Sequence, residues 1–85
     1  MRYNVTVPPT ADGALAVTII SWIRKLGEQV RKGQDLVEAT TEKIALYIPA
    51  PVDGVVAEIL VAEGTQARVG DVIGVVEGAG DEAGA

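Results

Sequence analysis

The chain of 85 residues repeats part of its own sequence, and this repeat limits the folds open to it. Val7-Pro8 and Asp12-Gly13 match Ile48-Pro49 and Asp53-Gly54 at a constant offset of 41 residues. Further along, at an offset of 37, five positions recur: Gly27, Gln29, Arg31, Gly33 and Leu36 match Gly64, Gln66, Arg68, Gly70 and Ile73. Two similar halves, near 3–40 and 44–77, therefore follow one another, and the first half contains four extra residues between Gly13 and Gly27.

Each half consists of short apolar runs separated by turn residues. Val, Ile, Ala and Leu dominate an apolar content of 48%, and ten glycines punctuate it. Strands are expected at 3–7, 17–23, 36–40, 44–48, 55–61 and 72–77, with a very short apolar step at Val30. The two halves predict an all-β fold in which two small sheets pack face to face and are related by a quasi-twofold axis.

One folded domain is all that this length allows. We expect it to span residues 1–77, while 78–85, which consists of Gly, Ala and acidic residues, is expected to be a flexible linker. A small folded unit followed by such a linker is typical of one module in a longer protein.

The residue types that are absent exclude several kinds of chemistry. The chain has no cysteine and no histidine, so disulfides, thiolate or histidine metal sites and histidine-based catalytic triads cannot form. A net charge of −5 argues against a nucleic-acid partner. No apolar run approaches the roughly 18 residues of a membrane span, so no membrane partner is expected. Glu38, Glu42 and Asp53 could form an acid/base pair, but strand and turn carboxylates are usually only solvated.

The junction between the halves contains the residue that stands out for function. Strand-forming runs flank Thr41-Glu42-Lys43-Ile44, which places Lys43 at or beside the tip of a β-hairpin. Glu-Lys is not one of the pairs that favour a two-residue hairpin turn, so the turn is placed by its neighbours. Under the quasi-twofold symmetry, Lys43 and the two termini lie at opposite ends of the sandwich. An ordinary solvated lysine is the alternative interpretation.

The same symmetry predicts that the longer loop, from Pro8 to about Val17, lies beside Lys43. A loop enlarged only where it borders an exposed lysine is a candidate recognition element, and a neutral insertion is the alternative. The recognition residues expected around Lys43 are Thr41, Glu42 and Ile44 on the hairpin and Asp12, Gly13, Ala14 and Leu15 on the loop.

From Val5 to Glu77 the sequence resembles the lipoyl domains of dihydrolipoamide acyltransferases in 2-oxo acid dehydrogenase complexes. The matching segments occur in the same order as in the family: Ile20-Ser21-Trp22-Ile23, 25–30, 33–38, Thr41-Glu42-Lys43-Ile44, 48–51, 53–56 and 64–73. The resemblance implies a flattened barrel or sandwich of two four-stranded antiparallel sheets with quasi-twofold symmetry, a barrel-sandwich hybrid. It also implies that the ε-amine of Lys43 carries lipoic acid through an amide bond and that the domain alone is not an enzyme.

The resemblance also implies a set of partners. The lipoyl arm on Lys43 would accept an acyl group from a thiamine-diphosphate 2-oxo acid decarboxylase, deliver it to an acyltransferase core for transfer to coenzyme A, and be reoxidised by dihydrolipoamide dehydrogenase. A lipoate ligase or an octanoyl/lipoyl transferase would attach the cofactor to a monomeric domain. The missing transit peptide favours a prokaryotic cytoplasm if Met1 is the natural start, with the mitochondrial matrix as the alternative.

Two departures from the family pattern bear on recognition. Glu42 and Ile44 stand where the family most often has Asp and then Ala or Val, and segment 9–17 lacks the acidic Glu-Gly signature that commonly precedes the Trp22 strand. Two alternatives stay open beside the lipoyl interpretation. One is a biotinyl carrier domain of a carboxylase, although such domains typically flank the lysine with methionines and the only methionine here is Met1. The other is an unmodified interaction or adaptor module of the same fold.

Overall fold

The computed structural model describes residues 1–78, which form eight strands. The strands are β1 (Arg2–Thr6), β2 (Ala16–Trp22), β3 (Gln29–Val30), β4 (Asp35–Thr40), β5 (Ala45–Pro49), β6 (Gly54–Ile59), β7 (Gln66–Arg68) and β8 (Val72–Gly78). Within this part of the chain no helix is long and apolar enough to cross a membrane. The all-β prediction is confirmed, and β7 is an additional strand in a segment that the apolar pattern left without one.

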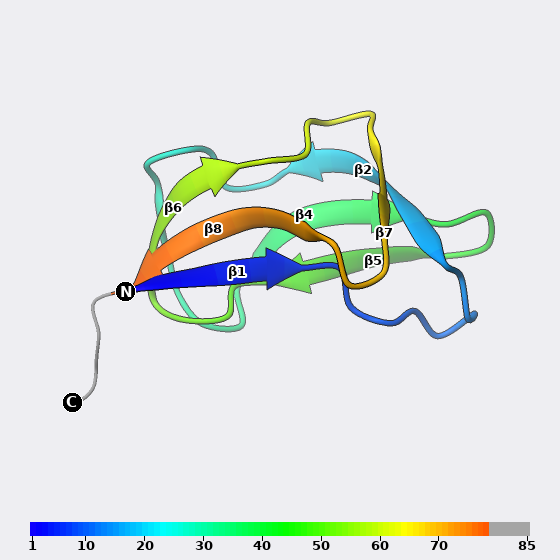
Figure 1. The fold of residues 1–85 in the computed structure, drawn as a ribbon, viewed down its shortest axis with the longest axis horizontal. Helices are drawn as coiled ribbons and strands as arrows, with labels where there is room; N and C mark the ends of the chain where they lie inside the picture. Colours follow the sequence, from blue (N-terminus) through cyan, green and yellow to red (C-terminus); the bar gives the residue numbers. More distant parts are fainter. Residues whose placement is uncertain (79–85) are drawn as a thin grey trace.

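The strands form two four-stranded sheets, ordered β1-β8-β6-β3 and β5-β4-β2-β7, in which every pairing is antiparallel. The sheets lie one behind the other as the two layers of a sandwich (Figure 1). Among residues 1–78 no strand pairs with a strand of the other sheet. The predicted sandwich is therefore confirmed, whereas its layers do not close into a barrel.

The core lies between the two sheets and consists of the inward-facing residues of both. The largest side chains that are fully buried are Ile19, Leu36, Ile48 and Ile73. Trp22, which is 2% exposed, also belongs to this core, and its Nε1 donates to the Val61 carbonyl at 2.9 Å. Burial of such apolar surface is the main force that holds a small sandwich together.

The quasi-twofold symmetry is visible in the strand registers. In one sheet Ile19 pairs with Ala39, and in the other Val56 pairs with Val76. Both residues of the second pair lie 37 positions after their counterparts in the first, as the sequence repeat predicts. Val37 pairs with Ile48, and its counterpart Gly74, 37 positions later, pairs with Val5. Ile48 is therefore the counterpart of Val5, and β1 and β5 are related by an offset of 43. The offset of 41 that the sequence suggested for this part is therefore wrong by two residues. A shift of two keeps every side chain on the same face, and the apolar pattern alone cannot separate the two registers.

This register changes the size of the extra loop. Val7 N donates to the Asp71 carbonyl at 3.0 Å, and its equivalent Ala50 N donates to the Gln34 carbonyl at 2.8 Å. The next equivalent positions are Val17 and Gly54. Nine residues, 8–16, separate Val7 from Val17, whereas three, 51–53, separate Ala50 from Gly54. The first half thus contains six extra residues rather than the four predicted, and all of them lie within 8–16.

The two ends of the described chain meet at one end of the sandwich. Gly78 N donates to the Met1 carbonyl at 2.7 Å, and the N-terminal ammonium donates to the Gly78 carbonyl at 3.3 Å. Figure 1 shows the N-terminus at the end opposite the turn between β4 and β5, which contains Lys43. Gly78 was predicted to begin the linker but is the last residue of β8, while 79–85 lie outside the described residues.

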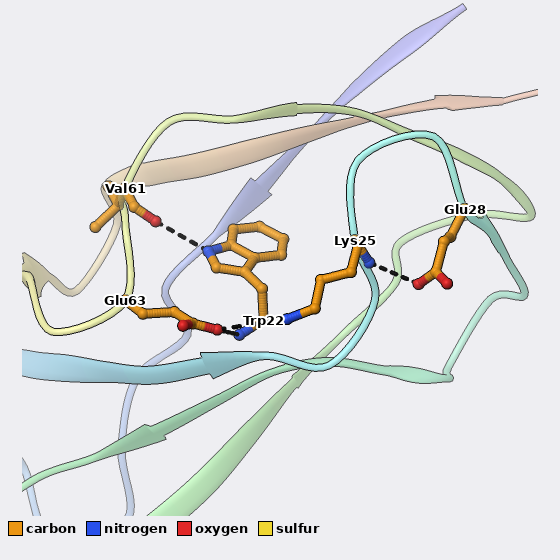
Figure 2. Close-up of polar contacts among 5 residues, drawn as sticks. All are labelled: Trp22, Lys25, Glu28, Val61 and Glu63. Carbon is orange, nitrogen blue, oxygen red and sulfur yellow. Dashed lines mark hydrogen bonds and ion pairs between the residues drawn. The ribbon is translucent and has the colours of Figure 1, made fainter.

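β7 pairs with β2 only from Ala16 to Thr18, and the loop between β6 and β7 supplies hydrogen bonds to the rest of β2. Glu63 accepts a hydrogen bond from the Trp22 backbone N–H at 2.9 Å and lies 3.6 Å from the Lys25 ammonium (Figure 2). Chiefly because of the Trp22 hydrogen bond, and then because of Lys25, the pKa of Glu63 is held below its usual value. The Glu63 carboxylate thus gives the Trp22 N–H the acceptor that a neighbouring strand would otherwise provide.

Candidate functional site

The turn between β4 and β5 is closed by a side chain. The strands pair as far as Thr40 and Ala45, and Thr41 N then donates to the Ile44 carbonyl at 2.8 Å. The Thr41 hydroxyl oxygen accepts hydrogen bonds from Lys43 N and Ile44 N, both at 3.1 Å. Within residues 1–78 only glycines have positive φ, so this turn is not one of the primed types that require it. The Thr41 hydroxyl therefore allows Glu42-Lys43 to form a tight turn without glycine.

Lys43 stands at the tip of this turn. Both Lys43 and Glu42 are exposed, whereas Thr41 and Ile44 on either side are half-buried. No carboxylate in the described part of the chain lies within ion-pair distance of the Lys43 ammonium. A lysine in this setting combines a long side chain with an amine that a partner can reach.

The loop 8–16 lies against the Lys43 turn and is held there by Asp12. Asp12 Oδ2 accepts a hydrogen bond from the Thr41 hydroxyl at 2.7 Å. Its Oδ1 accepts from the Thr10 hydroxyl at 2.6 Å and from Ala14 N at 3.2 Å, and the Thr10 oxygen accepts from Ala14 N at 2.9 Å. The hydrogen bonds from Thr10 and Thr41 lower the pKa of Asp12 below its usual value. Asp12 is therefore an ionised link between the loop and the turn.

Most of the residues predicted around Lys43 meet in one open groove between the loop and the turn. From the prediction, Asp12, Ala14, Leu15, Thr41 and Glu42 line this groove together with Lys43. Leu15 is 84% exposed, a large apolar side chain in solvent beside the lysine. The groove does not include Gly13, which takes a φ of 73° in the loop, or the half-buried Ile44.

Sequence reasoning did not single out four further residues of the site. Thr18 and Gln66 line the groove from the neighbouring strands, and the Thr40 hydroxyl has two acceptors within reach, the Thr41 carbonyl at 2.9 Å and the Ile44 carbonyl at 3.0 Å. Thr10 holds Asp12, as described above. The spacing Thr10-Ala11-Asp12-Gly13 is typical of a loop closed by side-chain hydrogen bonds, and this signal could have identified Thr10.

The acidic residues considered for acid/base chemistry do not converge. Glu42 is at the tip of the Lys43 turn and Glu38 lies within β4. Asp53 precedes Gly54, which pairs with Gly78 at the terminal end, and its Oδ1 accepts a hydrogen bond from Lys32 N at 2.7 Å. Within residues 1–78 no three acidic side chains are grouped so as to hold a metal ion. The reactive group that this arrangement presents is the Lys43 amine.

Fold and site together define a class: small two-sheet domains that present one lysine on a tight turn, at the end opposite the meeting of the first and last strands. Residues 3–76 match the model of the biotin/lipoyl family, described as "Biotin-requiring enzyme". The chain belongs to this family.

The curated relatives are acyltransferase components of dehydrogenase complexes. The chain is 35% identical over 77 residues to the dihydrolipoyllysine-residue succinyltransferase component of the 2-oxoglutarate dehydrogenase complex of Bartonella vinsonii subsp. berkhoffii, covering 91% of this chain and 19% of that protein. It is 38% identical over 73 residues to the dihydrolipoyllysine-residue acetyltransferase component of the pyruvate dehydrogenase complex of Staphylococcus epidermidis, covering 86% and 17%. The chain thus spans less than a fifth of the length of these relatives.

A solved structure shows the same fold. The lipoyl domain of the 2-oxoglutarate dehydrogenase complex from Azotobacter vinelandii superposes with a TM-score of 0.68 at 30% identity. The match covers 88% of this chain and 96% of that domain. The predicted resemblance to lipoyl domains is therefore confirmed at the level of family and fold.

Proposed function

We propose that this domain is a lipoyl carrier and that Lys43 is its attachment residue. The observation that carries the proposal is the state of Lys43: exposed, without an ion-pair partner in residues 1–78, and held on a turn whose backbone is fixed by Thr41. The relatives named above are dihydrolipoyllysine proteins, which supports a lipoyl group rather than another attachment.

The residues present fit this cofactor. Lys43 would hold lipoic acid through an amide bond to Nζ, a change that removes the positive charge of the side chain. The group would supply dithiol and disulfide chemistry, which a chain without cysteine lacks. Because the amine forms no ion pair with a described residue, the loss of its charge leaves no carboxylate without its partner.

The partners follow from the same proposal. In a complex of the kind named for the relatives, the domain would carry acyl groups from a thiamine-diphosphate 2-oxo acid decarboxylase to an acyltransferase core, and dihydrolipoamide dehydrogenase would restore its oxidised state. The turn between β4 and β5, which contains Lys43, lies at the end of the sandwich opposite Met1 and its neighbour Gly78 (Figure 1). This placement supports the role, because a tether at one end leaves the other free to approach several enzymes.

Biotin is the second candidate cofactor, since the matching family model is described by biotin. The experiment is to incubate the domain with a lipoate ligase, lipoate and ATP, and in parallel with a biotin ligase, biotin and ATP, and to measure intact mass and peptide maps. We expect a lipoyl mass increase confined to the Lys43 peptide and abolished in Lys43→Ala. A biotin increase alone would assign the domain to biotinyl carriers, and no increase with either ligase would favour an unmodified interaction module.

A further inference from the structure

We propose that Asp12 is a positioning residue for the modification of Lys43. It acts through Thr41: the Asp12 carboxylate orients the Thr41 hydroxyl, and this hydroxyl fixes the backbone amides on which Lys43 is presented. The inference rests on the proposed function, because it concerns how the attachment lysine is offered to the enzyme that modifies it.

The direction of each hydrogen bond follows from counting protons. An ionised carboxylate only accepts, so the single hydroxyl proton of Thr41 is used in the 2.7 Å bond to Asp12 Oδ2. Both lone pairs of the Thr41 oxygen are then available, and they accept Lys43 N and Ile44 N at 3.1 Å. The Ile44 carbonyl, 3.5 Å from the Thr41 oxygen, is the competing acceptor for the same proton. Asp12 thus decides which way the hydroxyl points.

Asp12 is itself held in place by the enlarged loop. The Thr10 hydroxyl and Ala14 N occupy its other oxygen at 2.6 and 3.2 Å. In the second half of the chain the equivalent loop has only three residues, 51–53, and its carboxylate, Asp53, accepts from Lys32 N instead. Among residues 1–78, the link from loop to turn is therefore made in the half that borders Lys43, where the six extra residues lie.

Replacing Asp12 by asparagine tests this link with almost no change in shape. The asparagine side chain has one accepting oxygen, whereas Asp12 uses both oxygens as acceptors, one for Thr10 and one for Thr41. If the amide oxygen serves Thr10, the NH₂ group faces Thr41 as a third donor and drives the hydroxyl proton toward Ile44. If it serves Thr41, Thr10 loses its acceptor and the loop is released.

The experiment compares Asp12→Asn with Asp53→Asn as the matched control, and Thr41→Val with Thr41→Ser. Amide hydrogen exchange is measured at Lys43 and Ile44, together with kcat/KM for lipoylation by a lipoate ligase and the Tm of each variant. Loss of one charge-assisted hydrogen bond predicts faster exchange at these two amides, by about tenfold, and a lower kcat/KM in Asp12→Asn. Thr41→Val should behave in the same way, whereas Thr41→Ser retains the hydroxyl and should keep most of the wild-type rate. Asp53→Asn should leave both readouts at the wild-type value.

The possible results separate three claims: the link between Asp12 and Thr41, the role of Asp12 in modification, and the proposed function. Unchanged exchange at Lys43 and Ile44 in Asp12→Asn would overturn the link itself. Faster exchange with an unaltered kcat/KM would overturn the role of Asp12 in modification. If exchange at the core amides of β4 and β8 rises equally, the effect is global and the positioning role is rejected. A wild-type domain that no ligase lipoylates would refute the proposed function, and the exchange data would still decide the link.

Discussion

The contact between Trp22 and Gly74 makes the size of residue 74 critical for stability. A methyl group built on Gly74 would lie 2.6 Å from Trp22 Cη2 and 2.9 Å from the Glu58 carbonyl oxygen. Carbon atoms pack best at about 3.5–4.0 Å, so the indole would have to move by roughly 1 Å in a core without spare room. Overpacking of this kind costs about 1–3 kcal/mol, and we expect Gly74→Ala to lower the free energy of unfolding by that amount.

For a domain of this size, about 1 kcal/mol corresponds to about 4–8 °C in Tm, so the variant should melt roughly 5–20 °C below wild type. Thermal and urea unfolding followed by circular dichroism would measure the change. Trp22→Phe removes the crowding part of the ring, and in a double-mutant cycle it should recover about 1 kcal/mol or more of the loss caused by Gly74→Ala.

The control is Gly13→Ala, at the far end of β2. Gly13 has a φ of 73° and open space where a Cβ would lie, so alanine there costs stability through the backbone alone. Its effect should add to that of Trp22→Phe without coupling. The steric argument would be refuted if the effects of Gly74→Ala and Trp22→Phe on the free energy of unfolding were additive, or if Gly74→Ala had the wild-type Tm.

Two further predictions concern other contacts of the sandwich. Gly54→Ala should destabilise the domain more than Gly74→Ala, because its Cβ would meet the backbone oxygen of Glu77, which cannot rotate away as a side chain can; urea unfolding measures this, and equal losses would contradict it. Because Glu63 has a lowered pKa in the folded state, its contribution to stability should be complete above the usual glutamate pKa and lost as the pH falls through the lowered one. The Tm difference between wild type and Glu63→Gln should therefore shrink between pH 6 and pH 2, and a difference that is constant over this range would exclude the carboxylate as its source.

The sequence predicts the two-layer arrangement of strands well because the internal repeat marks the same turns in both halves. Glycines at equivalent positions, such as Gly27 and Gly64, both adopt a φ of 85°, a conformation that other residues avoid. Such positions mark the same turn in both halves, and the turns determine where the strands reverse. The two-layer fold and the placement of Lys43 away from the termini follow from these turns.

The details that the sequence misses are those in which several local choices have similar energies. The sequence alignment of β1 with β5, its counterpart in the other sheet, is wrong by two residues because both alignments bury the same face of each strand. β7 has a single buried residue, Ala67, so its apolar pattern is too weak to indicate a strand. Gly78 belongs to β8 through its pairing with Gly54, a contact between positions 24 residues apart that composition does not reveal.

In the candidate site, too, some features could be predicted from the sequence and others could not. The exposed Lys43 and the neighbouring loop could be predicted from symmetry, whereas the hydrogen bond between Asp12 and Thr41 could not. That bond depends on the conformation of an irregular loop, which Thr10 fixes through its own contact with Asp12. Side-chain hydrogen bonds across 29 positions leave no periodic trace in a single sequence.

The meeting of Met1 and Gly78 has a consequence for how this unit can be connected to other polypeptides. Because the two residues exchange hydrogen bonds of 2.7 and 3.3 Å, the unit has a single entry and exit point. A host protein could therefore receive it within a surface loop without separating its own flanking strands, and a short peptide joining the two residues would give a circular chain that can be reopened elsewhere. In every such arrangement the Lys43 turn would project from the far side of the junction.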